Sequence, residues 1–225
     1  MSKHGNIDFP KLKELFTQFA DEDVAKGMSA YMKNRFAFFG IKTPNRRLLA
    51  RQFFAGDKKT DPIDWVFVFA CFDADGRELQ YAALDYMERH KGQLKSTDLA
   101  NIKQLILTKS WWDTVDCIDG FVGYLALKDS SINQTLLEWS IDENFWLRRI
   151  AIDHQLQRKD KTDTELLSTI IKNNLNQTEF FIGKAIGWAL REYSKTNPEW
   201  VRNFIAENKD NMASLSIREA SKYLK

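Results

Sequence analysis

Apolar residues recur along this chain at the spacing of an α-helix. Four of them follow the i, i+3, i+4, i+7 rule for one helix face: Leu12, Leu15, Phe16 and Phe19. Thr43-Pro44 pairs a capping residue with a proline suited to the first helical position, and it predicts a helix over residues 45–54. Asp61-Pro62 repeats this device ahead of the apolar run 65–72. No stretch alternates with period two for long enough to predict a sheet, so we expect an all-α protein of about ten to twelve helices.

Three segments repeat one local pattern. They span residues 146–151, 181–186 and 215–220, and each has a large apolar residue followed three positions later by a basic one. The basic residues are Arg149, Lys184 and Arg218, which lie 35 and 34 positions apart. The same interval counted backwards reaches Thr114 and then Gln80. A period of this length is typical of stacked helical hairpins, and it predicts a HEAT-like helical-repeat solenoid that forms a single domain over residues 1–225.

Equivalent residues of a solenoid form a row on one surface, usually the concave one. Here that row is basic, so we expect a concave basic surface although the 33 basic and 31 acidic residues give a net charge of only +2. A basic stripe is the electrostatic footprint of a polyphosphate ligand. The candidate contacts are Lys33, Arg47, Arg149, Lys184, Arg191 and Arg218. The alternative interpretation is that these residues only solvate exposed helix faces.

Composition adds few constraints. Glycine (10) and proline (4) are scarce in 225 residues, which favours helices joined by short turns. Cys71 and Cys117 lack the CxxC spacing and are expected to be small buried hydrophobes, and the three histidines have no H-x-x-x-H relation. We therefore expect neither a metal site nor a cofactor. No apolar run is long enough to span a bilayer, so the expected protein is soluble, cytoplasmic and monomeric, without membrane contact.

The segment 109–116, Lys-Ser-Trp-Trp-Asp-Thr-Val-Asp, sets two tryptophans beside two aspartates at a predicted helix start. Trp112 and Asp116 are four positions apart and so share one helix face. An aromatic plane next to a carboxylate suits a reaction that builds positive charge on a small organic ring. The alternative is structural: adjacent tryptophans often anchor a core, and an aspartate in a first helical turn complements the helix dipole.

Trp188 follows Gly187, which leaves room for another body to approach the helix. If the repeat holds, then Trp112, Asp116, Arg149 and Trp188 converge on one patch. Acyl transfer needs a nucleophile and a base, which this set lacks. The set fits N-glycosidic cleavage, whose transition state resembles an oxocarbenium ion. Asp116 would stabilise the cationic sugar, the indoles would offer cation–π attraction, and Arg149 would hold a backbone phosphate.

The whole chain resembles the AlkD-type family of bacterial DNA glycosylases, which are built from HEAT-like repeats and remove alkylated bases. The resemblance runs through residues 31–36, 39–44, 108–116, 146–149, 180–193 and 195–198. By position in these motifs, Asp116 matches the catalytic aspartate, and Trp112 and Trp188 match the aromatic residues that flank the lesion nucleotide. Arg149 matches a phosphate-contacting arginine, and Tyr31 matches a tyrosine near the same cleft. Gly183 is smaller than the residue expected at its position.

The resemblance implies activity on N3-methyladenine and N7-methylguanine in duplex DNA, in the bacterial cytosol and at the nucleoid when bound. Such cationic bases are good leaving groups, so no general acid is needed, and the sequence offers one suitable carboxylate, Asp116. Two alternatives remain: a non-catalytic HEAT-like scaffold that binds nucleic acid, and a protein-interaction solenoid. Neither has a use for a carboxylate in a basic, aromatic cleft.

Overall fold

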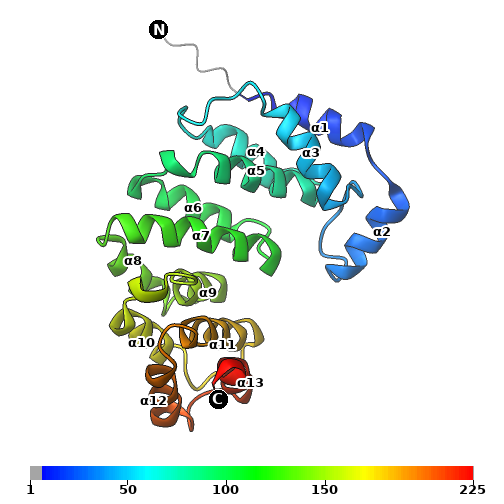
Figure 1. Ribbon diagram of the computed structural model, residues 1–225. Helices are drawn as coiled ribbons and strands as arrows, with labels where there is room; N and C mark the ends of the chain where they lie inside the picture. Colours follow the sequence, from blue (N-terminus) through cyan, green and yellow to red (C-terminus); the bar gives the residue numbers. More distant parts are fainter. Residues whose placement is uncertain (1–6, 225) are drawn as a thin grey trace. The chain divides into compact units, whose positions relative to one another are not determined.

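The computed structural model describes residues 7–224, and within that range it is helical and without strands. The described helices are α1 (Phe9–Gln18), α2 (Glu22–Tyr31), α3 (Thr43–Phe53), α4 (Trp65–Asp73), α5 (Arg77–Arg89), α6 (Leu99–Leu107), α7 (Trp112–Lys128), α8 (Ile132–Trp139), α9 (Phe145–Asp153), α10 (Thr164–Lys172), α11 (Phe180–Ser194), α12 (Pro198–Asn208) and α13 (Ser214–Ala220) (Figure 1). The described residues also form four short 3-10 helices: η1 (Lys91–Gln93) and η2 (Ser96–Asp98) between α5 and α6, η3 (Lys159–Lys161) between α9 and α10, and η4 (Ser221–Tyr223) after α13. The all-α prediction is confirmed, with slightly more helices than expected. None of the described helices is long and apolar enough to cross a membrane.

The chain divides between Lys109 and Ser110 into two compact units. The N-terminal unit holds α1 to α6, and the C-terminal unit holds α7 to α13. That residues 1–225 act as one domain stays a prediction.

In the N-terminal unit, the helix starts follow the capping residues only in part. Helix α1 buries Leu12 and Phe16, as the apolar pattern predicts, whereas Phe19 is exposed just beyond its end. Helix α3 begins two residues before the expected residue 45, because Lys42 is its N-cap, without a side-chain capping hydrogen bond, and Thr43-Pro44 belongs to the first turn. Helix α4 begins later than the Asp61-Pro62 pair suggests, because Asp64 is its cap and accepts a hydrogen bond from the Phe67 amide at 3.0 Å.

In the C-terminal unit, successive helices pack on their neighbours. Helix α9 packs on α7 and α8, and α11 packs on α9 and α13. The three repeated segments of the sequence lie on α9, α11 and α13, so in this unit the repeat interval does mark equivalent helices. Figure 1 shows α11 between α9 and α13. This stacking brings residues that are about 35 positions apart onto adjoining helices.

Helix α13 approaches α11 closely at Gly187. A Cβ added to Gly187 would lie 2.4 Å from the Cβ of Glu219 and 3.2 Å from the Ser216 carbonyl oxygen. The absence of a side chain at Gly187 therefore makes room for helix α13. Gly183, one turn earlier, is less crowded, because an added Cβ would meet its nearest neighbour, Leu215, at 3.5 Å. The small residue at position 183 thus leaves the packing of α13 intact.

We predict opposite effects for alanine at these two glycines. Gly187→Ala should lower the free energy of unfolding by about 1–3 kcal/mol, because α13 must move away from the new methyl group. Gly183→Ala should raise it by about 0.5–1 kcal/mol, since alanine favours the helix and its methyl group fits. Urea denaturation of both variants measures the difference. Equal effects would show that α13 does not pack tightly at Gly187.

Candidate functional site

The two adjacent tryptophans have different environments. Trp111 precedes α7 and is buried, with its ring centroid 5.2 Å from that of Phe181 and 5.9 Å from that of Trp146. Trp112 is the first residue of α7 and is partly exposed, one turn before Asp116. The core interpretation therefore holds for Trp111, whereas Trp112 lies on the same helix face as Asp116.

Asp116 and Arg149 form a bidentate ion pair between α7 and α9. Nε of Arg149 donates to Asp116 Oδ1 at 2.7 Å, and Nη2 donates to Oδ2 at 2.9 Å. Nη1 donates to the Phe181 carbonyl oxygen at 2.6 Å, which ties the same guanidinium to α11. The Arg149 side chain is only 2% exposed, whereas that of Asp116 is 22% exposed. The pair thus presents the carboxylate to solvent and keeps the guanidinium behind it.

This burial corrects the expected placement of Arg149 in a row on the surface. The side chain is enclosed because α11 covers α9, so its donors are used inside the protein. Its contact with a DNA phosphate stays a prediction.

Two further carboxyl groups surround this pair, and the sequence analysis missed both. Asp153 lies one turn after Arg149 on α9, with its Oδ2 3.7 Å from Arg149 Nε, and Asp119 lies one turn after Asp116 on α7. Burial raises the pKa of Asp153 from 3.8 to about 7, against the opposing charge of Arg149. Burial and the neighbouring Asp153 and Asp116 raise the pKa of Asp119 well above its usual value. The sequence does hold a signal for both residues, which is their helical spacing. Asp153 lies four positions after Arg149, and Asp119 lies three positions after Asp116.

The pKa of Asp116 is also raised, because burial outweighs the hydrogen bonds and the charge of Arg149. Of the three carboxyl groups, only Asp116 has both oxygens hydrogen-bonded to the guanidinium. Oδ1 of Asp153 is buried without a hydrogen-bond partner among the described residues, which adds to the cost of its ionisation. Asp116 is therefore the group that best carries negative charge in this cluster.

Trp188 on α11 is surrounded by cations. The guanidinium carbon of Arg149 lies 5.2 Å from its ring centroid, Lys184 Nζ lies at 5.1 Å and the Arg191 guanidinium carbon at 5.9 Å. Arg149 thus joins Trp188 to Asp116 within one unit, as the sequence analysis expected. The ring already engages protein cations, which leaves less of its cation–π attraction for a substrate.

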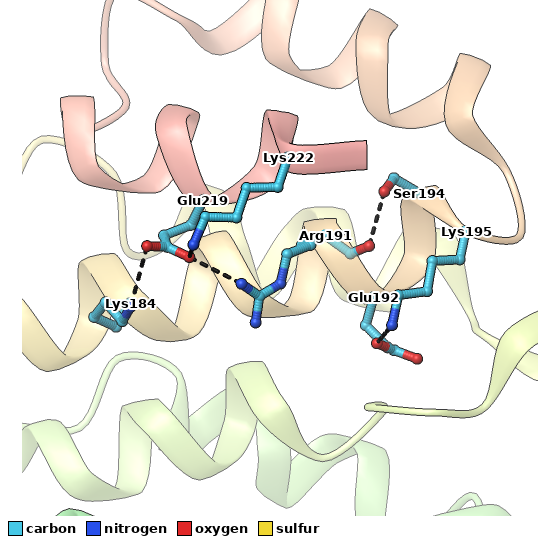
Figure 2. Close-up of polar contacts among 7 residues, drawn as sticks. All are labelled: Lys184, Arg191, Glu192, Ser194, Lys195, Glu219 and Lys222. Atoms are coloured by element: carbon cyan, nitrogen blue, oxygen red, sulfur yellow. Dashed lines mark hydrogen bonds and ion pairs between the residues drawn. The ribbon is translucent and has the colours of Figure 1, made fainter. Parts of the chain in front are cut away.

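Lys184 and Arg191 both bind Glu219, as Figure 2 shows. The sequence analysis placed Arg218 in this row, but the residue of α13 that contacts Lys184 is Glu219, and Arg218 is exposed. The interval from Lys184 to Arg218 is 34 positions, one fewer than the interval from Lys184 to the residue that contacts it. Glu219 lies 35 positions after Lys184, the same interval that separates Lys184 from Arg149.

The remaining predicted DNA contacts lie in the N-terminal unit. Tyr31 ends α2 and is exposed, and Lys33 is exposed just beyond it with a φ of 56°. Arg47 is exposed on α3, with its Nε 3.7 Å from Asp85 Oδ1. Their contact with DNA stays a prediction.

The cysteines and candidate metal ligands carry no site in the described part of the chain. Cys71 is buried, as expected, whereas Cys117 is exposed, so the expectation of two buried thiols is half wrong. Between residues 7 and 224, no three His, Cys, Asp or Glu side chains gather in a way that could hold a metal ion. His4 lies outside the described residues.

The C-terminal unit thus brings a carboxylate–guanidinium pair together with an indole and further basic side chains. Comparison with known proteins identifies the family. The model of the family described as DNA alkylation repair enzyme matches residues 12–224, and the chain belongs to this family. It therefore has a role in alkylation repair and binds DNA.

A solved structure described as "Predicted DNA alkylation repair enzyme from Enterococcus faecalis" is similar to this chain with a TM-score of 0.83 and 36% sequence identity. The similarity covers 91% of this chain and 96% of the other. No curated protein matches the chain.

The raised pKa of Asp153 gives a pH-dependent prediction. Its folded-state pKa of about 7 exceeds the usual 3.8, so the folded protein binds more protons than the unfolded chain between these values. The parent should therefore lose stability relative to Asp153→Asn as the pH rises from about 4 to about 7. Urea denaturation of both proteins across this range measures the effect. A stability difference that stays constant or grows in favour of the parent would mean that Asp153 is ionised throughout.

Proposed function

We propose that this protein is a DNA glycosylase that hydrolyses the N-glycosidic bond of cationic alkylated purines in duplex DNA. The observation that carries the proposal is the environment of Asp116. Its carboxylate is mostly buried, accepts hydrogen bonds from Arg149 at both oxygens and shares a helix face with Trp112. A binding scaffold has no need of such a group, because its charge repels phosphate. A repair enzyme that generates positive charge on a sugar does need it.

In the proposed reaction, the bond between C1′ and the base nitrogen breaks first. The bonding electrons leave with the alkylated base and neutralise its positive charge, and the sugar becomes an oxocarbenium ion. Asp116 stabilises this ion electrostatically. Water then adds to C1′ and releases a proton, and the products are the free base and an abasic site.

Arg149 is proposed to position Asp116. A carboxylate has about four acceptor positions, and the two hydrogen bonds from Arg149 occupy half of them. The exposed side of Asp116 keeps acceptor positions for the water and for the cationic sugar. A fixed orientation also lowers the reorganisation that the transition state would otherwise require.

The two carboxyl groups with raised pKa values bear on substrate choice. Asp153 is buried, so it is screened from a base at the surface, while Asp119 is partly exposed and burial raises its pKa well above the usual value. Selectivity for cationic bases therefore requires that Asp119 lie out of reach of the base. A comparison of charged and neutral lesions therefore tests whether Asp119 can protonate the departing base.

The first functional prediction concerns Asp116. Asp116→Asn keeps the shape and removes the negative charge, so single-turnover excision of N7-methylguanine should fall by about 10²–10³-fold, the usual effect of losing one preorganised electrostatic partner. Asp113→Asn is the matched control, because it removes a carboxylate from the first turn of the same helix, α7.

Asp116→Asn removes the negative charge that compensates the buried guanidinium of Arg149, so we expect it to lower the stability of the protein. Thermal unfolding checks that both variants are still folded. Equal excision by the folded Asp116→Asn protein and the parent would contradict the mechanism. An equal loss in the two variants would point to the general charge of the helix start.

The second functional prediction concerns the leaving group. The protein should release N3-methyladenine and N7-methylguanine and leave uracil and hypoxanthine in place, because general acid assistance, typically worth 10²–10⁴-fold, is absent at the base. Single-turnover release from duplexes that carry one defined lesion each measures this. Comparable rates on uracil and N7-methylguanine would show that an acid acts on the base. A selective loss of uracil release in Asp119→Asn would then identify it.

A further inference from the structure

Glu219 on α13 collects three cations. Its Oε1 accepts a hydrogen bond from Lys184 Nζ at 3.2 Å, and its Oε2 accepts from Arg191 Nη1 at 3.0 Å and from Lys222 Nζ at 2.7 Å (Figure 2). Lys184 and Arg191 come from α11, and Lys222 comes from η4 directly after α13. We call these four residues the Glu219 cluster.

The carboxylate at the centre of this cluster is held rigidly. Its side chain is 6% exposed, and its backbone belongs to the helix that packs against Gly187. Hydrogen bonding from Lys222, with help from Lys184, lowers the pKa of Glu219 from 4.5 to about 2, so the group is ionised at any pH of practical use. Glu219 is therefore a buried negative charge to which three more exposed cations are bound.

The Glu219 cluster carries more positive charge than its fold requires. Three cations and one carboxylate leave two positive charges uncompensated, and the side chains of Lys184, Arg191 and Lys222 are 23%, 26% and 48% exposed. A surface ion pair that only stabilises a helix contact needs one cation for each carboxylate and contributes little. Each ammonium group has three donors, and the hydrogen bond to Glu219 uses one of them, so donors remain for an incoming anion.

The Glu219 cluster also adjoins the proposed active site. Lys184 and Arg191 both lie within 6 Å of the Trp188 ring, at 5.1 and 5.9 Å from its centroid, and Arg149 approaches the same ring. Cations beside an indole that faces a nucleotide are well placed to neutralise the phosphate attached to that nucleotide.

We propose that the Glu219 cluster is a binding site for a phosphodiester group of the DNA backbone and that Glu219 is its positioning residue. Lys222 adds a third cation, from η4, to the two that α11 supplies. Glu219 holds the three cations together, two of them beside Trp188, so that they meet the phosphate next to the damaged nucleotide without first being ordered. This inference rests on the proposed function for the identity of that nucleotide, and phosphate binding itself can be tested separately.

The test of phosphate binding uses undamaged duplex DNA, so that it is independent of excision. Lys222→Met should lower the slope of log binding constant against log salt concentration by about 0.9, the value for one lost phosphate contact. Lys209→Met is the matched control, since Lys209 is an exposed lysine at the end of α12 outside the Glu219 cluster, and its slope should equal that of the parent. Equal slopes for Lys222→Met and the parent would overturn the phosphate site.

The test of positioning uses Glu219→Gln, which keeps the shape and removes the charge. We expect a salt slope no steeper than that of the parent, together with a fall of about tenfold or more in excision from the saturated complex, because the cations lose their alignment. Glu219→Asp should restore part of the rate. A slope steeper by about one with unchanged excision would overturn the positioning role and make Glu219 a simple counter-charge. If the parent excises nothing, the proposed function fails, while the slopes of the lysine variants still decide on the phosphate site.

Discussion

The guanidinium of Arg149 is buried, and an unpaired charge in that position would be strongly destabilising. The protein compensates it with two hydrogen bonds to Asp116 and one to the Phe181 carbonyl oxygen, so that one side chain joins α7, α9 and α11. The same contacts set the orientation of Asp116 and leave it partly exposed. The ion pair that the C-terminal unit needs for folding is therefore also the one that presents a carboxylate to a substrate.

Close packing of α13 on α11 extends this arrangement. Gly187 allows the two helices to approach until Glu219 lies beside the cations of α11, next to Trp188. The Trp188 ring thus lies near Arg149, which binds Asp116, and near Lys184, which binds Glu219. Such a combination of carboxylates and cations suits a substrate with a cationic centre and an anionic backbone.

Much of this could be predicted from the sequence, because apolar spacing and capping residues report directly on helices. The repeat interval identified α9, α11 and α13 as equivalent, and the four-residue spacing of Trp112 and Asp116 placed them on one face. The interval did not identify Glu219, because a one-residue error in register rotates a side chain by about 100° around a helix. Nor did it reveal that Arg149 is buried, since periodicity indicates a face and not how deeply a neighbouring helix covers it.

The central claim is that this family member breaks the N-glycosidic bond, and one product analysis tests it most directly. The parent protein is incubated with a duplex that contains a single N7-methylguanine, and both the released small molecules and the DNA strand are measured. The account predicts free 7-methylguanine and an equal amount of abasic sites. Recovery of unmodified guanine in an intact strand, or an unaltered lesion after prolonged incubation with folded protein, would contradict it.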